Sequence, residues 1–457
     1  MVLNASRFLG FLQAAAVFAA AAMPAHAQQN VSVIRDAEIE ALVADYARPI
    51  FKAAGLGRAN TEIILVNDPS FNAFVAGRRM FINTGALMTA ETPNEIIGVM
   101  AHEAGHIAGG HQERLRQQLE SARTLSIVAG LIGAGAAIAG AASKNTAAAQ
   151  AGAGIAVGGA EAARRGLLAY QRTEEATADR SAVTYLEKTG QSAAGMLKTF
   201  KRFEGMLSLS GVQVDPYQVS HPMPRERIAA LQTLAEQSVN FGKADSPSLQ
   251  ARHDLMRAKI AAYTQGQGES ARLLKRSGNA QAIAYGDAVR SLLYGNPAAA
   301  LKKADMLAKG DPKSPWFQEL RGDILLKANK PAQAAEAYAK AIRLDPRKSS
   351  MLQVGYAQAL IATGKPEALD KAARTLNETL QRDRENAAGY ALLAQAEGRR
   401  GNIAEAELAT AEGYYYSGDI KQAKSFAARA QQKMKNGAPG WLRAQDILNT
   451  KTSKKKS

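Results

Sequence analysis

The stretch that most constrains this chain is the pentapeptide His-Glu-Ala-Gly-His at residues 102–106, which follows an apolar run. Pro93 before that run suits the first turn of a helix, and the apolar residues after it recur at helical spacing. Positions four apart share one face of a helix, so the imidazoles of His102 and His106 can bind one metal ion together. The sequence therefore predicts a helix that carries two ligands of a metal site.

Glu103 directly follows the first of these histidines and can reach a water molecule on the same ion. Catalytic zinc sites use imidazole ligands and keep one position open, and zinc acidifies its water so that a carboxylate can take the proton. The spacing is that of the HExxH metallopeptidases. The chain has six histidines, and three of them lie between residues 102 and 111. This clustering favours a metal site over a helix that carries two histidines by chance.

The composition limits the chemistry and the partners. A chain of 457 residues is long enough for two or three domains. It contains no cysteine, so any zinc must be held by His and Asp or Glu. The net charge of +16 favours acidic partners or an anionic membrane surface. The basic residues are spread along the chain, apart from a basic tail at 451–457, and no nucleic-acid motif is present, so we expect no nucleic-acid partner.

Residues 1–27 have the features of a secretory signal peptide. Arg7 supplies the positive charge, residues 8–22 form the apolar core, and Ala-His-Ala at 25–27 suits cleavage before Gln28. We therefore expect an exported protein. The absence of cysteine is compatible with a bacterial periplasm.

Residues 28–265 are expected to form one domain of helices with a small sheet. Residues 36–54 have helical periodicity, residues 62–66 form a β-branched run, and residues 72–83 have the pattern of a hairpin. A strand beside a metallopeptidase cleft can pair with an extended peptide by β-addition. A purely structural hairpin fits the same residues.

Two segments, 126–143 and 147–160, are rich in Ala and Gly and nearly free of charge. Each is short and weakly apolar for a bilayer of about 30 Å. We therefore favour a closely packed pair of small-residue helices, or a mobile lid, over a transmembrane span. Peripheral membrane contact through residues 126–160 is a further alternative, because small-residue faces also pack well in lipid. Another helix is expected to begin at Tyr170.

From about residue 281 the chain is helical and repetitive. In the unit at 315–348, small and aromatic residues stand at the offsets of the tetratricopeptide pattern, namely Gly322, Ala334, Tyr338, Ala341 and Pro346. Asp-Pro pairs at 311 and 345 are 34 residues apart, which is one repeat length. Helix hairpins of this kind need neighbours to cover their apolar faces, so we predict an α-solenoid over 266–450. An unrelated helical bundle is the alternative.

Two histidines leave a zinc site incomplete. The candidates for a further ligand are His111, Glu174, Glu175, His221 and His253. On an unbroken helix His111 lies about 140° from His106, so it should not share the ion. A glutamate on a second helix would give the His₂Glu set of catalytic zinc sites, and Asp179 could hydrogen-bond a ligating imidazole. The spacing leaves Glu174 and Glu175 open, and His253, on an amphipathic helix, fits a structural role better.

Four motifs occur in one order along the chain: Asn-Ala-Phe at 72–74, the pentapeptide at 102–106, Arg-x-x-Glu-x-x-Ala-Asp at 172–179, and Ser-His-Pro at 220–222 followed by Arg227-Ile228. In these motifs the chain resembles the zinc peptidases of the CAAX-prenyl-protease superfamily, in particular periplasmic members with a tetratricopeptide C-terminal half. The pattern departs at Gln171, where Ser is usual.

The resemblance implies that His102, His106 and Glu175 bind Zn²⁺ and that Glu103 is the base. It also implies that His221 can occupy the open zinc position and hold the enzyme latent. The implied fold is mainly α, with a gluzincin-type peptidase domain and small sheet followed by the repeats.

The implied activity is that of a periplasmic zinc endopeptidase in quality control or assembly of outer-membrane proteins. Its protein substrates would be barrel precursors or components of their assembly machinery, bound by the repeats. A periplasmic chaperone or scaffold with a largely latent site is the first alternative. A membrane-embedded prenyl-type protease is the second.

Overall fold

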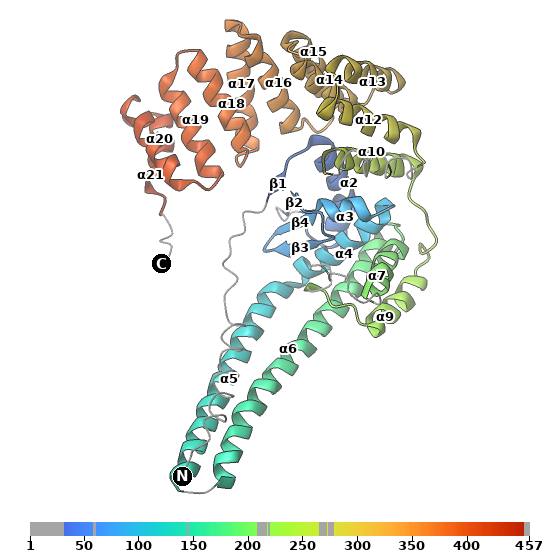
Figure 1. Ribbon diagram of the computed structural model, residues 1–457, viewed down its shortest axis with the longest axis vertical. Helices are drawn as coiled ribbons and strands as arrows, with labels where there is room; N and C mark the ends of the chain where they lie inside the picture. Colours follow the sequence, from blue (N-terminus) through green and yellow to red (C-terminus); the bar gives the residue numbers. More distant parts are fainter. Residues whose placement is uncertain are drawn as a thin grey trace.

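The computed structural model describes residues 32–57, 61–143, 146–207, 217, 220–264, 272 and 278–451. The predicted signal peptide, the predicted boundary near 266 and most of the basic tail lie outside these residues. The described chain consists of a helical body with a small sheet, a long helical hairpin and a curved array of helices (Figure 1).

The sheet has four strands in the order β1-β2-β4-β3. Their bounds are Val33–Ile34 for β1, Glu62–Val66 for β2, Ala73–Ala76 for β3 and Arg79–Asn83 for β4. β2 and β4 are parallel, and the other two pairs are antiparallel. β3 and β4 form the predicted hairpin, whose turn contains Gly77 at a φ of 61°. β3 therefore lies at an edge of the sheet.

The helices of the body pack on the sheet and on one another and enclose one large apolar core. They are α2 (Ala37–Ala53), α3 (Thr84–Thr89), α4 (Pro93–Gly109), α7 (Ala194–Leu207) and α9 (Arg225–Glu236). Helix α4 is buried from Pro93 to His106, and it begins with the predicted proline in its first turn. A Cβ on Gly98 would lie 2.6 Å from Cβ of Met196, so glycine is what allows α4 and α7 to pack this closely.

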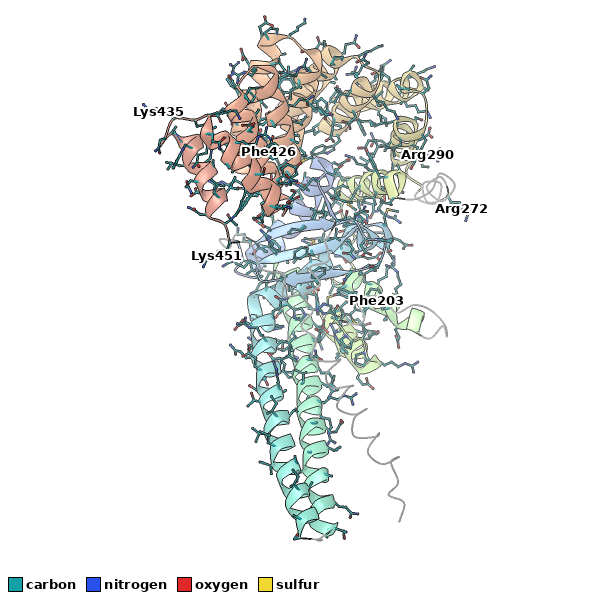
Figure 2. All side chains as sticks on the ribbon, turned by 60° about the vertical axis from the view of Figure 1, so that its left-hand side comes forward. Phe203, Arg272, Arg290, Phe426, Lys435 and Lys451 are labelled. Atoms are coloured by element: carbon teal, nitrogen blue, oxygen red, sulfur yellow. The ribbon has the colours of Figure 1, made fainter. Side chains whose placement is uncertain are left out.

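The hairpin consists of α5 (His111–Ala142) and α6 (Thr146–Lys188), which project together from the body (Figures 1 and 2). Small residues set their separation: a Cβ on Gly133 would lie 2.4 Å from the carbonyl oxygen of Gly152, and one on Gly159 would lie 2.2 Å from Cβ of Ala129. The prediction of closely packed small-residue helices is confirmed. The expected separate helix beginning at Tyr170 is wrong, because α6 runs unbroken through that position.

The C-terminal array is built of antiparallel helices that pack each on the next and curve back toward the sheet (Figure 1). Its helices after α10 (Pro247–Thr264) are α12 (Ala280–Tyr294), α13 (Pro297–Gly310), α14 (Pro315–Lys327), α15 (Pro331–Leu344), α16 (Ser350–Thr363), α17 (Pro366–Arg382), α18 (Ala387–Arg399), α19 (Ile403–Tyr416), α20 (Ile420–Gln432) and α21 (Pro439–Asn449).

The best-matched repeat shows why its small residues are needed. The ring of Tyr338 on α15 lies between Gly322 on α14 and Gly355 on α16. A Cβ would come within 2.7 Å of the ring at Gly322 and within 2.5 Å at Gly355. Larger residues at these two positions would push neighbouring helices apart.

Helix α10 joins the body to the array because it belongs to two cores. Met256 and Ile260 lie in the core of the body. Leu255 and Ala258, on another side of the helix, lie in the core formed with α12, α13 and α14. The buried ammonium of Lys259 adds a polar link, 2.7 Å from Asp36 Oδ2, 3.3 Å from Glu38 Oε2 and 3.4 Å from Glu319 Oε2.

Candidate metal centre

Helix α4 packs closely against α6, and this packing brings His102 and His106 of α4 next to Glu175 of α6. A Cβ on Gly105 would lie 3.1 Å from Cα of Ala178, a tighter contact than side chains usually make, so glycine suits this close approach of the helices. With glycine there, His102 and His106 face Glu175 in a buried site. The small residues in both motifs therefore position the polar ones.

The distances within this site are close to those of a metal centre. Nε2 of His102 lies 3.0 Å from Nε2 of His106, and each of these atoms lies 3.4 Å from a carboxylate oxygen of Glu175. Ligands about 2.0–2.2 Å from a tetrahedral zinc ion would be separated by roughly 3.3–3.6 Å. These three side chains can therefore hold one such ion.

His221 supplies a fourth donor at the same point. It lies between the buried ring of Tyr217, at 4.7 Å between centroids, and helix α9. Its Nδ1 is 3.1 Å from both carboxylate oxygens of Glu175 and 3.4 Å from Nε2 of His102. His221 thus stands where the fourth ligand of a tetrahedral ion would be.

Glu103 is fully buried beside this cluster. Neither of its carboxylate oxygens has a hydrogen-bond partner among the described residues, and the closest imidazole nitrogen, Nε2 of His221, is 3.5 Å away. Burial raises the pKa of Glu103, against a smaller lowering by His221 and His102. An orphaned buried carboxylate is costly. A water molecule on a bound ion would give it a partner, and a raised pKa suits a general base.

The electrostatics of the two helical histidines differ. Burial lowers the pKa of His106 to about 2, which keeps its imidazole neutral and able to donate a lone pair. Burial also lowers the pKa of His102, but the carboxylates of Asp179 and Glu175 outweigh that effect and raise it to about 9. Because metal binding competes with protonation, a cation could take the place of that proton.

A second group of side chains holds these residues in place. Oδ1 of Asp179 lies 2.9 Å from Nδ1 of His102, as the sequence predicts for a carboxylate that orients a ligand. Arg227 on α9 donates to both oxygens of Asp179 at 2.7 and 2.8 Å, and it lies 2.8 Å from Glu175. No role for Arg227 followed from its residue type or spacing. The only available signal was its place in the motif at 220–228.

The chain between α4 and α5 differs from expectation. The helix predicted to run unbroken to His111 instead ends at Gly109, Gly110 follows with a φ of 64°, and His111 begins α5. Its Nδ1 then lies 2.8 Å from Nδ1 of His106, and its Nε2 lies 2.9 Å from Glu174. The prediction of an unbroken helix is wrong, although His111 still lies outside the four-residue cluster. It contacts the far side of His106.

The structure also distinguishes among the other candidate metal ligands. Glu174 lies away from the cluster, 2.6 Å from Nη2 of Arg114 and beside His111, whereas Glu175 lies within it. His253 on α10 lies 2.9 Å from the hydroxyl of Tyr46 and 3.0 Å from the carbonyl oxygen of Ala90. These contacts fit the structural role expected of His253.

The two adjacent glutamates can be compared directly. We expect Glu175→Gln to weaken zinc binding far more than Glu174→Gln, because Glu175 faces both helical imidazoles and Glu174 reaches His106 only through His111. Replacing a residue behind the ligands typically costs about 10- to 100-fold in metal affinity. Competition with a chromophoric chelator measures both affinities. A larger loss in Glu174→Gln would assign the ligand to Glu174.

Comparison with known proteins identifies the class. Residues 34–235 match the model of peptidase family M48, and residues 302–411 match the TPR domain of cytochrome c-type biogenesis protein H. The chain thus carries an M48 metalloprotease domain followed by tetratricopeptide-like helical repeats. The predicted fold, mainly helical with a small sheet and a repeat array, is confirmed.

Several curated proteins are similar over most of the chain. The beta-barrel assembly-enhancing protease of Escherichia coli (strain K12) is 27% identical over 389 residues, which cover 82% of this chain and 75% of that protein. The protein of the same name from Yersinia pestis is 24% identical, with coverage of 83% and 76%. The putative beta-barrel assembly-enhancing protease of Vibrio cholerae is 25% identical, with coverage of 90% and 83%.

Proposed function

We propose that this protein is a periplasmic zinc endopeptidase that acts in quality control or assembly of outer-membrane proteins. The observation that carries the chemistry is the set of separations among His102, His106 and Glu175, which fit one zinc ion. The names of the related proteases support a role in barrel assembly. The signal-like residues 1–27 support export.

The residues of the site have distinct tasks in this proposal. Zinc bound there would polarise the scissile carbonyl and acidify a water molecule. Glu103 takes the proton of the attacking water and returns it to the leaving amine. Asp179 and Arg227 hold His102 and Glu175 in the orientation that the site requires.

Metal analysis and a cleavage assay test this function together. The purified protein should contain about one zinc per chain and cleave an unstructured peptide. A strong chelator should remove both the zinc and the cleavage, and added Zn²⁺, but not Mg²⁺, should restore them. The variant His102→Ala should lack zinc. Cleavage that continues in the metal-free protein would refute the proposal.

The repeat array is the proposed binding surface for clients or assembly machinery. A cavity of about 470 Å³ lies between α17, α18, α19 and α21, where Tyr390, Tyr416, Arg384 and Arg443 are among the lining residues. Aromatic and arginine side chains are enriched where proteins bind one another. This surface is far from the metal centre in sequence and would contribute recognition rather than chemistry.

A chaperone with a latent peptidase site is a second candidate function. The observation that favours it is the position of His221, whose Nδ1 stands at the fourth corner of the metal centre. With that corner filled, the attacking water would have no place. The two functions are compatible if His221 moves away when a client binds.

We also propose that the end of the hairpin contacts the membrane surface. By length and composition, α5 from His111 to Ile138 could cross a membrane. Large apolar side chains in this part are exposed to solvent, including Leu131 at 70% and Val157 at 68%. Because Ala129 lies against Gly159, Arg123 and Arg165 come at one level of the hairpin, before the segments 126–143 and 147–160, which contain no charged residue. Arginines at that level could bind anionic headgroups.

Flotation with lipid vesicles measures this contact. We expect the protein to bind vesicles that contain anionic lipid, to bind neutral vesicles less, and to lose binding in the double variant Leu131→Asp/Val157→Asp. The control is Leu119→Asp, since Leu119 is exposed on the same helix but precedes Arg123. Equal binding by the double variant and the control would exclude the contact.

A further inference from the structure

The edge strand β3 presents backbone groups on its free side. The N–H of Asn83 donates to the carbonyl of Asn72 just before the strand, which fixes the alternation of the antiparallel pair. In such a pair, every second residue turns its N–H and C=O away from the partner strand. Ala73 and Val75 are therefore the residues of β3 whose backbone groups point outward, and Gly77 continues the series into the turn.

The side chain of Gln112 already occupies the end of this edge. Its Oε1 accepts a hydrogen bond from the N–H of Gly77 at 2.9 Å, and its Nε2 donates to the carbonyl of Val75. One amide thus satisfies a carbonyl and the N–H two residues later. A neighbouring backbone uses the same two groups when it pairs with a strand. The glutamine amide takes the place of a piece of polypeptide.

This edge lies beside the metal centre. Gln112 directly follows His111, whose ring contacts the back of His106 at 2.8 Å. At the other end of β3, Phe71 packs on Tyr217, at 5.7 Å between ring centroids, and Tyr217 packs on His221. An extended chain that pairs with β3 would therefore run past the metal centre and meet Gln112.

We propose that Gln112 is a specificity-determining residue that competes with the backbone of an extended polypeptide substrate for the end of β3. Among the described residues, no hydrogen bond engages the backbone groups of Ala73 or the N–H of Val75, whereas the carbonyl of Val75 and the N–H of Gly77 must first be released by Gln112. Lengthening a substrate along this part of the edge then adds little affinity. The inference rests on the proposed peptidase function.

The test starts with a peptide from a random library that the wild-type protein cleaves. Matched labelled peptides are then lengthened on one or the other side of the scissile bond, and their Kd values are measured by fluorescence anisotropy in a Glu103→Gln background. We expect Gln112→Ala to tighten binding of the peptide lengthened on one side by about fivefold or more, because two backbone hydrogen bonds become available. The short peptide should bind as before.

Two further measurements separate this competition from a tether between α5 and the sheet. N-methylation of one backbone nitrogen in the longer peptide should remove the gain, because it removes the donor to the Val75 carbonyl. The control Gln118→Ala, at an exposed glutamine of the same helix, should show no gain. If Gln112 only tethers α5, Gln112→Ala will change the affinity of both peptides equally, or its gain will not respond to N-methylation, and either result overturns the inference.

The outcome also shows which proposal has failed. If neither the wild-type protein nor the His221→Ala variant cleaves any peptide of the library, the peptidase function fails and this inference fails with it. If peptides are cleaved but Gln112→Ala gives no length-dependent gain, only the inference about Gln112 is wrong.

Discussion

Glu103→Gln is expected to abolish peptide cleavage and to leave the zinc content unchanged. The amide of glutamine cannot accept the proton of the attacking water, and general-base catalysis is worth about 10²–10⁴-fold in rate. Glu103 is not among the four clustered donors, so the metal should stay. The measurements are the cleavage rate of an unstructured peptide and elemental analysis of the same preparation.

A matched control lies on the same helix. Glu95 is also fully buried on α4, but it pairs with Lys198 at 3.0 Å and Arg202 at 2.6 Å, away from the metal centre. Glu95→Gln should lower the thermal midpoint, because it weakens these two ion pairs, and it should keep the cleavage rate per folded molecule. Wild-type cleavage by Glu103→Gln would show that another residue is the base.

His221→Ala is expected to raise proteolysis about tenfold or more, including cleavage of the protein by itself. In the structure His221 fills the fourth corner of the metal centre, so its removal would open that position to water. The rate of peptide cleavage and the appearance of fragments during storage report the effect. Glu226→Ala, at an exposed residue of α9, is the control and should behave as wild type.

The double variant Glu103→Gln/His221→Ala identifies the source of the fragments. If the protein cleaves itself, the fragments must disappear in the double variant. A rate for His221→Ala at or below that of wild type would argue against latency. It would instead give His221 a structural role or a role in stabilising the transition state.

The central part of the site could be predicted because it depends on local geometry. His102, Glu103 and His106 lie on one helix, where a spacing of four residues is enough to place both imidazoles on one face. Asp179 could be predicted in the same way, one turn after Glu175. The order of these motifs along the chain also resembles that of a known family, which supplied the role of His221.

The remaining features depend on how elements pack. Glu174 and Glu175 differ by one position on α6, and which of them faces α4 is decided where Gly105 meets Ala178. No helical period in the sequence contains that information. Arg227 reaches the site from α9, and its contact depends on tertiary structure alone. The contact of Gln112 with β3 likewise depends on tertiary structure, because it joins α5 to a strand that lies earlier in the chain.

One error had a signal in the sequence. The prediction of an unbroken helix to His111 is wrong, and Gly109 and Gly110 before it are the signal, because glycine at a left-handed position is a common end of a helix. The opposite error occurred at Tyr170. The polar residues after an Ala-rich stretch indicated that a new helix begins there. Instead α6 runs through both stretches, since alanine is itself a strong helix former.

Helix α10 makes the peptidase body and the repeat array one thermodynamic unit. Its apolar faces are shared between two cores, so neither half can unfold without exposing part of the other. A fragment that ends near residue 266 would retain all the candidate metal ligands but would leave Leu255 and Ala258 uncovered. The array is therefore not a detachable module. An unrelated repeat domain would have to reproduce this shared packing, together with the contacts of Ala37 with Ala341 and Leu352 and the ion pair between Arg35 and Asp383.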